Sequence, residues 1–581
     1  MEKVKINIDG IQTEVPVGST ILQAAKQVGI DIPTLCHMKE LNEIAACRIC
    51  VVEVEGARNT AAACVQPVFE GMVVRTHTKK VRKLRKATLE LILSDHHVEC
   101  LTCTRNGSCE LQTLSEELGV KQIKFEGIKT QGTVLDTSSH SVVRDQSKCI
   151  LCGRCVKMCK QQSTGVLDFT DRGIKTKVST VMNRPITEVP CISCGQCINV
   201  CPVAALREKD NTEEVWDAIE NPDIHVIVQT APAVRAALGE EFGYPIGTRI
   251  TGKMVAALKR LGFDKVYDTN FAADLTIMEE GHELLDRIQN GGALPLITSC
   301  SPGWINFCEY NYPEFLPNLS TCKSPHQMMG AIAKSYYAEK NNIDPKNIFV
   351  VSVMPCVAKK GEAKRPMMHV NGIVDVDAVI TTRELARMIT QARIEFRNLE
   401  DDIFHQDLIG EYTGAGAIFG TTGGVMEAAI RTVADVLTGQ DLDRIEYQEV
   451  RGLEGVKEAS LQLGDITAKV AIVHGAGNAA KLMEKLKAGE ADYHFVEIMA
   501  CSGGCVNGGG QPIVTPKIRE EVNVRAKRAE ALYEEDESRQ IRKSHKNPQI
   551  QKLYDDYLEK PNSHKAHKLL HTTYKAKEFV L

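Results

Sequence analysis

Cysteine is the residue whose number and spacing in this chain most strongly indicate chemistry. The sequence holds 21 cysteines among 581 residues, and 15 of them fall within the first 201 residues. So many thiols in a long chain with no recognisable export signal are more typical of metal ligands than of disulfides. Short Cys-x-x-Cys loops deliver several thiolates to one small inorganic core, so the pattern predicts iron–sulfur clusters.

Two cysteine runs of identical spacing carry the strongest local signal. Residues 149–159 and 191–201 each space four cysteines by two, two and three residues. This is the spacing of two-cluster bacterial ferredoxins, in which the fourth Cys of each run binds the other cluster. We therefore expect residues 140–208 to form a domain with two [4Fe-4S] clusters. The two expected ligand sets are Cys149, Cys152, Cys155 and Cys201, and Cys191, Cys194, Cys197 and Cys159.

Residues 1–78 are expected to form a small β-grasp domain of the [2Fe-2S] ferredoxin type. Alternating apolar residues around Asp9-Gly10 predict a hairpin, and Thr20 with Gln23 forms a capping box that predicts a helix start. A Cys-x2-Cys pair between two single cysteines is the plan of a plant-type [2Fe-2S] site, although the first gap is ten residues instead of four. A structural zinc site is the alternative. The expected ligands are Cys36, Cys47, Cys50 and Cys64.

Residues 79–125 are expected to hold a further [4Fe-4S] cluster. They begin with a basic helical run and then place one histidine ahead of three cysteines, without a fourth cysteine nearby. Three thiolates and one neutral imidazole can hold such a cluster and should raise its potential. The expected ligands are His96, Cys100, Cys103 and Cys109, with His97 as the rival to His96.

The chain changes character after residue 208. Apolar strands, such as the one expected over 224–228, alternate with helices, such as the one expected over 251–261. This alternation is typical of an α/β domain, which we expect over residues 213–517. Residues 518–581 are charged and predict a helical segment that wraps or caps this domain. A surface helix there is expected to carry His564, His567 and His571, with metal binding as the lesser alternative.

Three segments of the α/β domain place cysteines beside glycine, proline or methionine. They span residues 298–304, 354–362 and 497–512, and the last one is rich in glycine, which permits close backbone approach. Four clusters in a row imply a redox centre at the end of the row. The spacing indicates that the three segments converge on a metal centre but does not identify it.

These segments resemble the signature segments of the [FeFe]-hydrogenase catalytic domain. The resemblance is carried by Met-Pro-Cys at 354–356 and by Met-Ala-Cys-Ser-Gly-Gly-Cys at 499–505. The cluster domains before them resemble those of long clostridial and multisubunit NAD(P)-linked hydrogenases, so the resemblance covers essentially the whole chain. It implies an H-cluster, which is a [4Fe-4S] cubane joined through one thiolate to a two-iron subsite with CO, cyanide and a bridging dithiolate.

The resemblance also implies which residues hold this cofactor. Cys505 would be the bridging thiolate, and Cys356 and Cys501 would bind the cubane. Lys359 would hydrogen-bond one cyanide, since a buried cation needs an anionic partner. The other residues expected around the two-iron subsite are Met354, Met499, Ala231 and Pro232.

One pair of residues departs from the family pattern. The family has two adjacent cysteines, of which the first relays protons and the second binds the cubane, whereas this chain has Cys300-Ser301. A match position by position makes Cys300 the relay and puts Ser301 at the ligand. The preference of iron for thiolate favours the reverse, with Cys300 as the fourth cubane ligand. We favour Cys300 as the relay, because a thiol with a pKa of about 8.5 suits proton transfer better than a hydroxyl.

The family's proton path implies a further set of residues. Glu280 and Glu283 lie three apart on one expected helix face, and Arg287 follows one turn later. With Ser320 they fit the Glu, Ser, Glu, Arg order of the family's path, whereas a solvated acidic face is the alternative. Two other cysteines, Cys308 and Cys322, are expected to be core thiols.

The residues together predict an enzyme that catalyses 2 H⁺ + 2 e⁻ ⇌ H2. One [2Fe-2S] and three accessory [4Fe-4S] clusters would pass electrons to ferredoxin, or to flavin-bearing or formate-handling subunits, and maturation proteins would install the H-cluster. A non-catalytic iron–sulfur electron-transfer subunit is one alternative. A relative that senses H2 or assembles iron–sulfur clusters is the other.

Composition excludes several other classes of function. A net charge of −5 disfavours nucleic acid as a partner. The sequence shows neither a signal peptide nor an apolar run of membrane length, which predicts a cytoplasmic protein without membrane insertion. It also lacks a Gly-rich dinucleotide fingerprint between a strand and a helix, so direct NAD(P)H chemistry is not expected.

Overall fold

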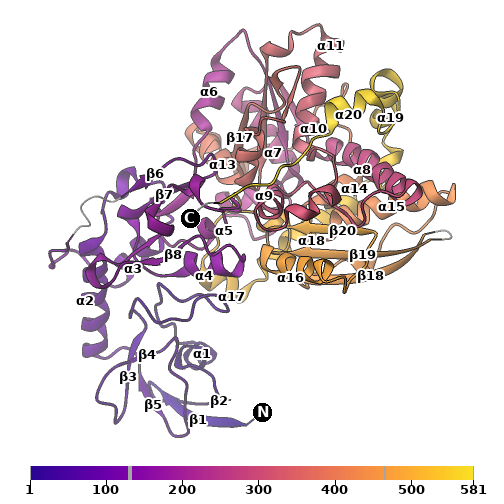
Figure 1. The fold of residues 1–581 in the computed structure, drawn as a ribbon. Coiled ribbons are helices and arrows are strands. Elements are labelled where there is room, and N and C mark those ends of the chain that lie inside the picture. Colours follow the sequence, from indigo (N-terminus) through magenta and orange to yellow (C-terminus); the bar gives the residue numbers. More distant parts are fainter. Residues whose placement is uncertain (1, 129–133, 464–465, 580–581) are drawn as a thin grey trace.

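The computed structural model describes residues 2–128, 134–463 and 466–579, so the outermost ends of the first and last predicted domains lie outside the described residues. The chain forms several separate sheets with their own helices. In Figure 1 the N-terminal sheet stands at the foot of the molecule, and two four-stranded sheets with their helices form its bulk. The segment with α4 (Arg154–Gln161) and α5 (Gln196–Asn199) lies between them. This arrangement confirms the predicted multidomain fold class.

A five-stranded sheet of order β2-β1-β5-β3-β4 and helix α1 build the N-terminal domain. Asp9 and Gly10 turn the first hairpin with φ angles of 50° and 93°. The Thr20 hydroxyl accepts from Gln23 N while the Gln23 side chain accepts from Thr20 N, so the predicted capping box is present. The elements are β1 (Lys3–Ile8), β2 (Ile11–Pro16), α1 (Ile21–Gln27), β3 (Val51–Val54), β4 (Ala61–Ala62) and β5 (Val73–Arg75).

Helix α2 (Lys79–Asp95) leads from this domain to the next cysteines and ends at His96, and α3 (Glu110–Glu117) begins directly after Cys109. In the following region, α4 and α5 each start behind a glycine in the left-handed conformation, Gly153 (φ 79°) and Gly195 (φ 69°). The two cysteine runs therefore fold into two matching loop–helix units. Short antiparallel pairs accompany them, namely β6 (Leu135–Asp136), β7 (Val142–Asp145), β8 (Asp168–Thr170), β9 (Lys177–Ser179) and β10 (Leu206–Glu208).

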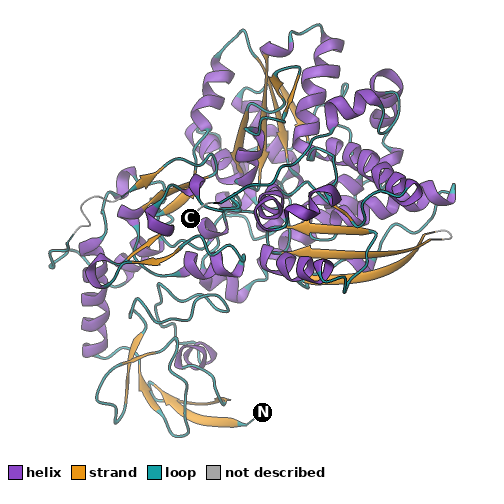
Figure 2. Ribbon diagram, in the orientation of Figure 1, coloured by secondary structure: helices purple, strands orange, loops and turns teal. Residues whose placement is uncertain are grey.

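Two four-stranded sheets with helices on their faces form the large α/β domain (Figure 2). The first has the order β12-β11-β14-β17 and is parallel, and the second, β13-β20-β19-β18, is parallel except at its β18–β19 hairpin. The carboxyl ends of β14 and β20 run into the Met-Pro-Cys and Met-Ala-Cys segments. Both sheets thus deliver a cysteine loop from the end at which α/β proteins bind ligands. Their strands are β11 (His225–Thr230), β12 (Lys265–Asp268), β13 (Leu296–Ile297), β14 (Ile348–Met354), β17 (Ala378–Thr381), β18 (Val456–Leu463), β19 (Ile466–His474) and β20 (Phe495–Met499). A separate two-stranded sheet consists of β15 (His369–Val370) and β16 (Ile373–Val374).

Helix α8 (Asn270–Asn290) packs against α10 and α15, and most of its residues up to Leu285 are buried. This burial makes α8 a core helix of the domain although it carries several carboxylates. The other helices of the domain are α6 (Thr212–Glu220), α7 (Thr251–Leu261), α9 (Pro302–Asn311), α10 (Pro325–Ile332), α11 (Ala338–Asn341), α12 (Ala358–Ala363), α13 (Thr382–Gln391), α14 (Gly414–Ala417), α15 (Gly424–Thr438) and α16 (Ala476–Lys487).

The C-terminal segment follows the catalytic domain as helices α17 (Pro516–Glu521), α18 (Val524–Glu537), α19 (Pro548–Leu553) and α20 (His564–Leu570). His564 and His567 are exposed on α20, as predicted. The surface prediction was wrong for His571, whose side chain is only 5% exposed and lies 3.0 Å from a Glu279 oxygen of α8. The chain turns inward after α20, because residues 570–572 pair with the backbone around Cys322.

Candidate active site

The duplicated cysteine loops bring their thiols together in the exchanged pattern. An apolar cavity is lined by Cys149, Cys152, Cys155 and Cys201. Burial and the nearby Cys201 thiol raise the pKa of Cys149 to about 11 and that of Cys152 to about 12. Buried thiols of this kind lose their protons when a metal binds them, so the donor set fits an iron–sulfur cluster.

The second thiol set lies against the catalytic domain. Burial raises the pKa of Cys191 to about 11, and the nearby Cys159 thiol adds to this rise. Beside this set, a Cβ on Gly195 would stand 2.4 Å from Val357 and 3.0 Å from Gly509, so only glycine permits this close approach. Asn199 also donates to the Gly508 carbonyl at 3.0 Å. This cysteine set therefore lies directly beside the Gly-rich segment of the catalytic domain.

The thiols of the N-terminal domain also converge. Cys50 Sγ lies 3.3 Å from Cys64 Sγ, and Cys47 N donates to Cys36 Sγ at 3.5 Å. The loop between Cys36 and Cys47 is braced by Asn42, whose amide donates to the carbonyls of Cys36 (2.7 Å) and of Cys152 (2.9 Å). This contact ties the enlarged loop to the ferredoxin region.

The geometry at the end of α2 differs for the two candidate histidines. His96 is buried and its Nδ1 has no hydrogen-bond partner among the described residues, whereas His97 is exposed. Burial and the Lys148 charge lower the pKa of His96 to about 4, which keeps the imidazole neutral. A neutral imidazole with an unpaired nitrogen fits a metal ligand, and a pocket here is lined by His96, Cys100 and Cys109.

Four cysteines from the three signature segments, Cys300, Cys356, Cys501 and Cys505, lie close enough to shift one another's pKa values. Burial and the Cys356 thiol raise the pKa of Cys505 to about 12, while the Lys359 charge opposes the rise. Burial together with the Cys356 and Cys194 thiols raises the pKa of Cys501 well above its ordinary value. Cys194 belongs to the second ferredoxin set, so that set and the catalytic cysteines are neighbours.

Lys359 is a buried cation, and the structure gives it an anionic partner that sequence reasoning missed. Its Nζ lies 2.8 Å from a Glu362 oxygen and donates to the Cys300 carbonyl at 3.0 Å. The same Glu362 oxygen bonds to His326 Nε2 at 2.7 Å. Although burial raises it, the charges of Lys359 and His326 lower the pKa of Glu362 to about 2. Lys359 is therefore held next to Cys300 by an ionised carboxylate.

Cys300 and Ser301 face different neighbours. Burial and the Glu280 carboxylate raise the pKa of the Cys300 thiol well above its usual range. The Ser301 hydroxyl instead accepts from Ala500 N at 3.2 Å, beside Cys501. Cys300 thus lies on the side of the α8 carboxylates, and Ser301 lies on the side of the segment that carries Cys501.

Three of the four residues expected on the proton path are joined by hydrogen bonds, and Glu280 lies near them. Ser320 donates to Glu283 Oε2 at 3.1 Å, and Arg287 donates to Glu283 Oε1 at 2.6 Å. Burial raises the pKa of Glu280 to about 8, against the opposing effect of the Ser320 hydroxyl. The Glu283 and Arg287 side chains are each 11% exposed, so the row runs from near the surface to the buried Glu280.

The remaining expected residues form buried walls. Met354 and Met499 end strands β14 and β20, and Ala231-Pro232 follow β11 at the same sheet edge as β14. A further buried carboxylate that the sequence did not indicate is Glu497, which accepts from Gly423 N at 2.6 Å and from Met426 N at 2.8 Å. It caps the start of α15, a role that no local spacing signals.

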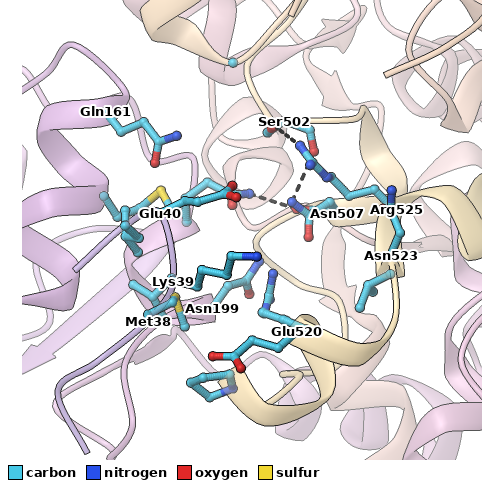
Figure 3. Close-up of a pocket in the computed structure, with 18 of the residues that line it drawn as sticks. Met38, Lys39, Glu40, Gln161, Asn199, Ser502, Asn507, Glu520, Asn523 and Arg525 are labelled. Atoms are coloured by element: carbon cyan, nitrogen blue, oxygen red, sulfur yellow. Dashed lines mark hydrogen bonds between the residues drawn. The ribbon is translucent and has the colours of Figure 1, made fainter. Parts of the chain in front are cut away.

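A polar pocket of about 500 Å³ lies behind the Gly-rich segment (Figure 3). Its wall combines residues 38–41, 161–162, 474–478 and 519–525, which come from four of the predicted domains. Arg525 donates to Ser502 Oγ at 2.8 Å, and the Asn507 amide donates to the Ser502 carbonyl at 3.1 Å. These bonds fix the loop between Cys501 and Cys505 from outside.

Comparison with known proteins extends these observations to the whole chain. Helices that are long and apolar enough for a membrane span are absent from the described residues. The matching family models are the 2Fe-2S cluster binding domain (1–79), the NADH-ubiquinone oxidoreductase-G iron-sulfur binding region (85–124), the 4Fe-4S dicluster domain (148–205), the C-terminal domain of the iron only hydrogenase large subunit (224–509) and the iron hydrogenase small subunit (522–577). The predicted domain boundaries remain predictions.

Similar proteins match most of this chain, and their names identify them as hydrogenases. The NADP-reducing hydrogenase subunit HndD of Solidesulfovibrio fructosivorans is 49% identical over 99% of both chains. Iron hydrogenase 1 of Clostridium pasteurianum is 46% identical over 98% of this chain and 99% of its own. A solved [FeFe]-hydrogenase from Chlamydomonas reinhardtii is 42% identical, covers 63% of this chain and 99% of its own, and has a TM-score of 0.57. With its cluster-binding loops, two cysteine-bearing sheet ends and matching relatives, the chain belongs to the [FeFe]-hydrogenase family.

Proposed function

We propose that this chain catalyses 2 H⁺ + 2 e⁻ ⇌ H2 at an H-cluster held by the three signature segments. The observation that carries the proposal is the convergence of Cys300, Cys356, Cys501 and Cys505 beside the buried cation Lys359. When bound, an H-cluster supplies the site at which protons, electrons and H2 interconvert. The protein contributes the ligands, excludes water and brings charge to and from this site.

Cys505 would provide the bridging thiolate, and Cys356 and Cys501 would bind the cubane. Lys359 would hydrogen-bond a cyanide while Glu362 orients its ammonium group. The residues that would enclose the two-iron subsite are Met354, Met499, Ala231 and Pro232. They are apolar and lie at or beside the ends of two sheets, which suits a dry site.

Four accessory clusters would connect this site to an electron partner. We assign one [2Fe-2S] cluster to the N-terminal domain, one [4Fe-4S] cluster to His96 and its three cysteines, and two to the exchanged ferredoxin sets. Support comes from the packing of Gly195 against Gly509, since the last accessory set and the catalytic loop then touch. Electrons would therefore leave the buried site through the protein rather than through solvent.

Protons would travel between Cys300 and the surface through Glu280, Ser320, Glu283 and Arg287. Hydrogen bonds join Arg287 to Glu283 and Glu283 to Ser320, and Glu280 lies near enough for Ser320 and Glu283 to shift its pKa. Glu280, with a pKa of about 8, can both hold and release a proton near neutral pH, as a relay must. Placing Cys300 beside Glu280 supports the assignment of Cys300 to proton relay and of Ser301 to the cubane side.

The electron partner is proposed from the similar proteins. A flavin-bearing subunit that exchanges electrons with NAD(P)H is the first candidate, because a relative identical at 49% is an NADP-reducing hydrogenase subunit. Ferredoxin and a formate-handling subunit are the other candidates. A cytoplasmic location stays a prediction, which fractionation of the native host would test.

Maturation followed by a gas assay tests the proposal. The chain is produced together with H-cluster maturation proteins, and H2 evolution from a reduced viologen dye is measured by gas chromatography. We expect turnover in the parent protein and in the matched variant Cys308→Ala, which alters a buried thiol of a different core, and none in Cys505→Ala. A matured parent protein with full cluster content and no turnover would favour the electron-transfer or sensory alternatives.

A further inference from the structure

A second group of metal-type ligands lies beside the proton row. Glu283, Cys322 and His571 each offer one ligand atom, and these three atoms lie within 4.8 Å of one another. They come from three distant parts of the chain, namely α8, the loop before α10 and the segment after α20. We infer that they form a binding site for one divalent cation of the zinc class, seated on the proton path.

The backbone holds the two softer ligands side by side. Cys322 and His571 form an antiparallel β-bridge, fixed by Lys323 N bonding to Leu570 O and by Thr572 N bonding to Thr321 O, both at 2.7 Å. Side chains of directly opposed residues in such a pair stand close together on one face. The thiol and the imidazole are therefore placed by main-chain hydrogen bonds and not by side-chain packing alone.

Each of the three residues offers one ligand atom to a metal. Arg287 takes Oε1 of Glu283, while Oε2 accepts from Ser320 and from Thr321 N, each at 3.1 Å, and lies 3.9 Å from the Cys322 thiol. His571 Nε2 lies 3.0 Å from a Glu279 oxygen, which places the ring proton on Nε2. The lone pair is then on Nδ1, where it accepts from the Thr321 hydroxyl at 2.7 Å, a bond that the ion would replace. A carboxylate behind a ligating histidine is the usual support of a metal site.

The local charge also favours a dication. Glu279 and Glu283 of α8 lie near the Cys322 thiol, and among the described ion pairs Arg287 is their one arginine or lysine partner. A bound dication would offset this excess. It would take up Cys322 as thiolate, with the thiol proton released to solvent.

The donor set selects the cation class. One thiolate, one imidazole and one carboxylate suit Zn²⁺ and disfavour Mg²⁺ or Ca²⁺, which prefer oxygen ligands. Tetrahedral zinc needs ligand atoms about 3.5 Å apart, so the side chains would close by about 1 Å around the ion. The exposed His567 ring lies against His571, with the ring centroids 4.0 Å apart and the ring planes tilted by 34°.

The expected consequence is inhibition, and this part rests on the proposed function. A cation on Glu283 Oε2 would displace the Ser320 hydrogen bond and occupy a carboxylate that the proton row needs. Zinc should therefore slow turnover while leaving the catalytic cysteines and the accessory clusters intact.

Zinc binding to the cluster-loaded protein is the primary test, because it does not depend on activity. After chelator treatment, equilibrium dialysis with ZnCl2 and metal analysis should give one site, and zinc-edge X-ray absorption should show one sulfur with nitrogen or oxygen ligands. Cys322→Ala and His571→Ala should each weaken binding at least about a hundredfold, since even a residue behind a ligand costs ten- to a hundredfold. Cys308→Ala, a matched buried thiol, should bind as the parent does.

Several outcomes overturn the inference. Zinc affinity unchanged in Cys322→Ala or His571→Ala, an absorption spectrum without a sulfur shell, or equal binding of Mg²⁺ would each remove the site. Cys322→Ser serves as a second variant should the alanine change disturb folding, and it should also weaken binding. Turnover is compared for each protein with and without zinc. We expect at least tenfold slowing in the parent and in Cys308→Ala, and little slowing in Cys322→Ala or His571→Ala. If zinc binds at these ligands but does not slow turnover, the metal site stands and the proposed inhibition is refuted.

Discussion

Replacing Glu283 with Gln removes one charge from the middle of the proposed proton row while keeping the size of the side chain. The amide cannot take up and release a proton, so the row from Arg287 to Glu280 is interrupted. Loss of a positioned acid–base group typically costs 10²- to 10⁴-fold in rate, which corresponds to about 3–5 kcal/mol of activation free energy. We expect a loss of turnover in this range.

The structure also indicates why this variant should fold. Arg287 keeps its bonds to four backbone carbonyls, those of Ala293, Pro317, Asn318 and Leu319. The cost in free energy of unfolding should then stay near that of one charge-assisted hydrogen bond, about 1.5–3 kcal/mol.

The assay measures H2 evolution together with the infrared spectrum of the resting site and the melting temperature. The control is Asp286→Asn, an exposed carboxylate on the same helix, which should retain full activity. The expected result is a nearly unchanged spectrum with strongly reduced turnover in Glu283→Gln alone. Activity within about twofold of the parent, or the same loss in the control, would refute the role of Glu283 and return this helix face to a structural role.

Three further predictions concern the site and its clusters. Cys300→Ala should assemble the whole H-cluster and turn over very slowly, whereas Ser301→Cys should stay active with a shifted cubane potential. If Cys300→Ala lacks the cubane, Cys300 is the fourth cubane ligand and not the relay. Because the pKa of Glu280 is raised from 4.5 to about 8, its contribution to the free energy of unfolding should fall as pH rises between these values. The melting temperature of the parent minus that of Glu280→Gln should therefore decrease over this window, and a difference independent of pH would contradict the raised pKa. Fully matured protein should contain about 20 iron atoms by metal analysis, with two in the [2Fe-2S] cluster, four in each of three accessory cubanes and six in the H-cluster. An iron content of about 14 atoms would mean that the H-cluster is absent.

The parts of this molecule that the sequence predicted are those specified by neighbours along the chain. The capping box at Thr20, the hairpin at Asp9-Gly10 and the helix over 251–261 depend on residues a few positions apart, and all three are present. The positions of Cys201 near Cys149 and of Cys159 near Cys191 were also predictable. They follow from a duplicated spacing whose geometry is imposed by the cluster.

The parts that the sequence did not predict depend on contacts between distant segments. Glu362 ends the 354–362 segment, three residues after Lys359, but its second partner His326 lies 36 residues away and outside all three segments. His571 was expected on a surface helix because the helical pattern extends to it. The β-bridge to Cys322 turns it inward instead, 292 residues from its partner Glu279. Such pairs arise from the packing of the C-terminal segment on the domain, which no local periodicity encodes.

The measurement that most directly tests the central claim is the infrared spectrum of the protein produced with maturation proteins, compared with that of Cys505→Ser prepared in the same way. CO and cyanide bound to iron give stretching bands in a region where protein absorbs little. We expect these bands in the parent protein, and their loss in Cys505→Ser with the accessory clusters retained by electron paramagnetic resonance. A parent protein with all accessory clusters and no CO or cyanide bands would contradict the claim that this chain holds an H-cluster.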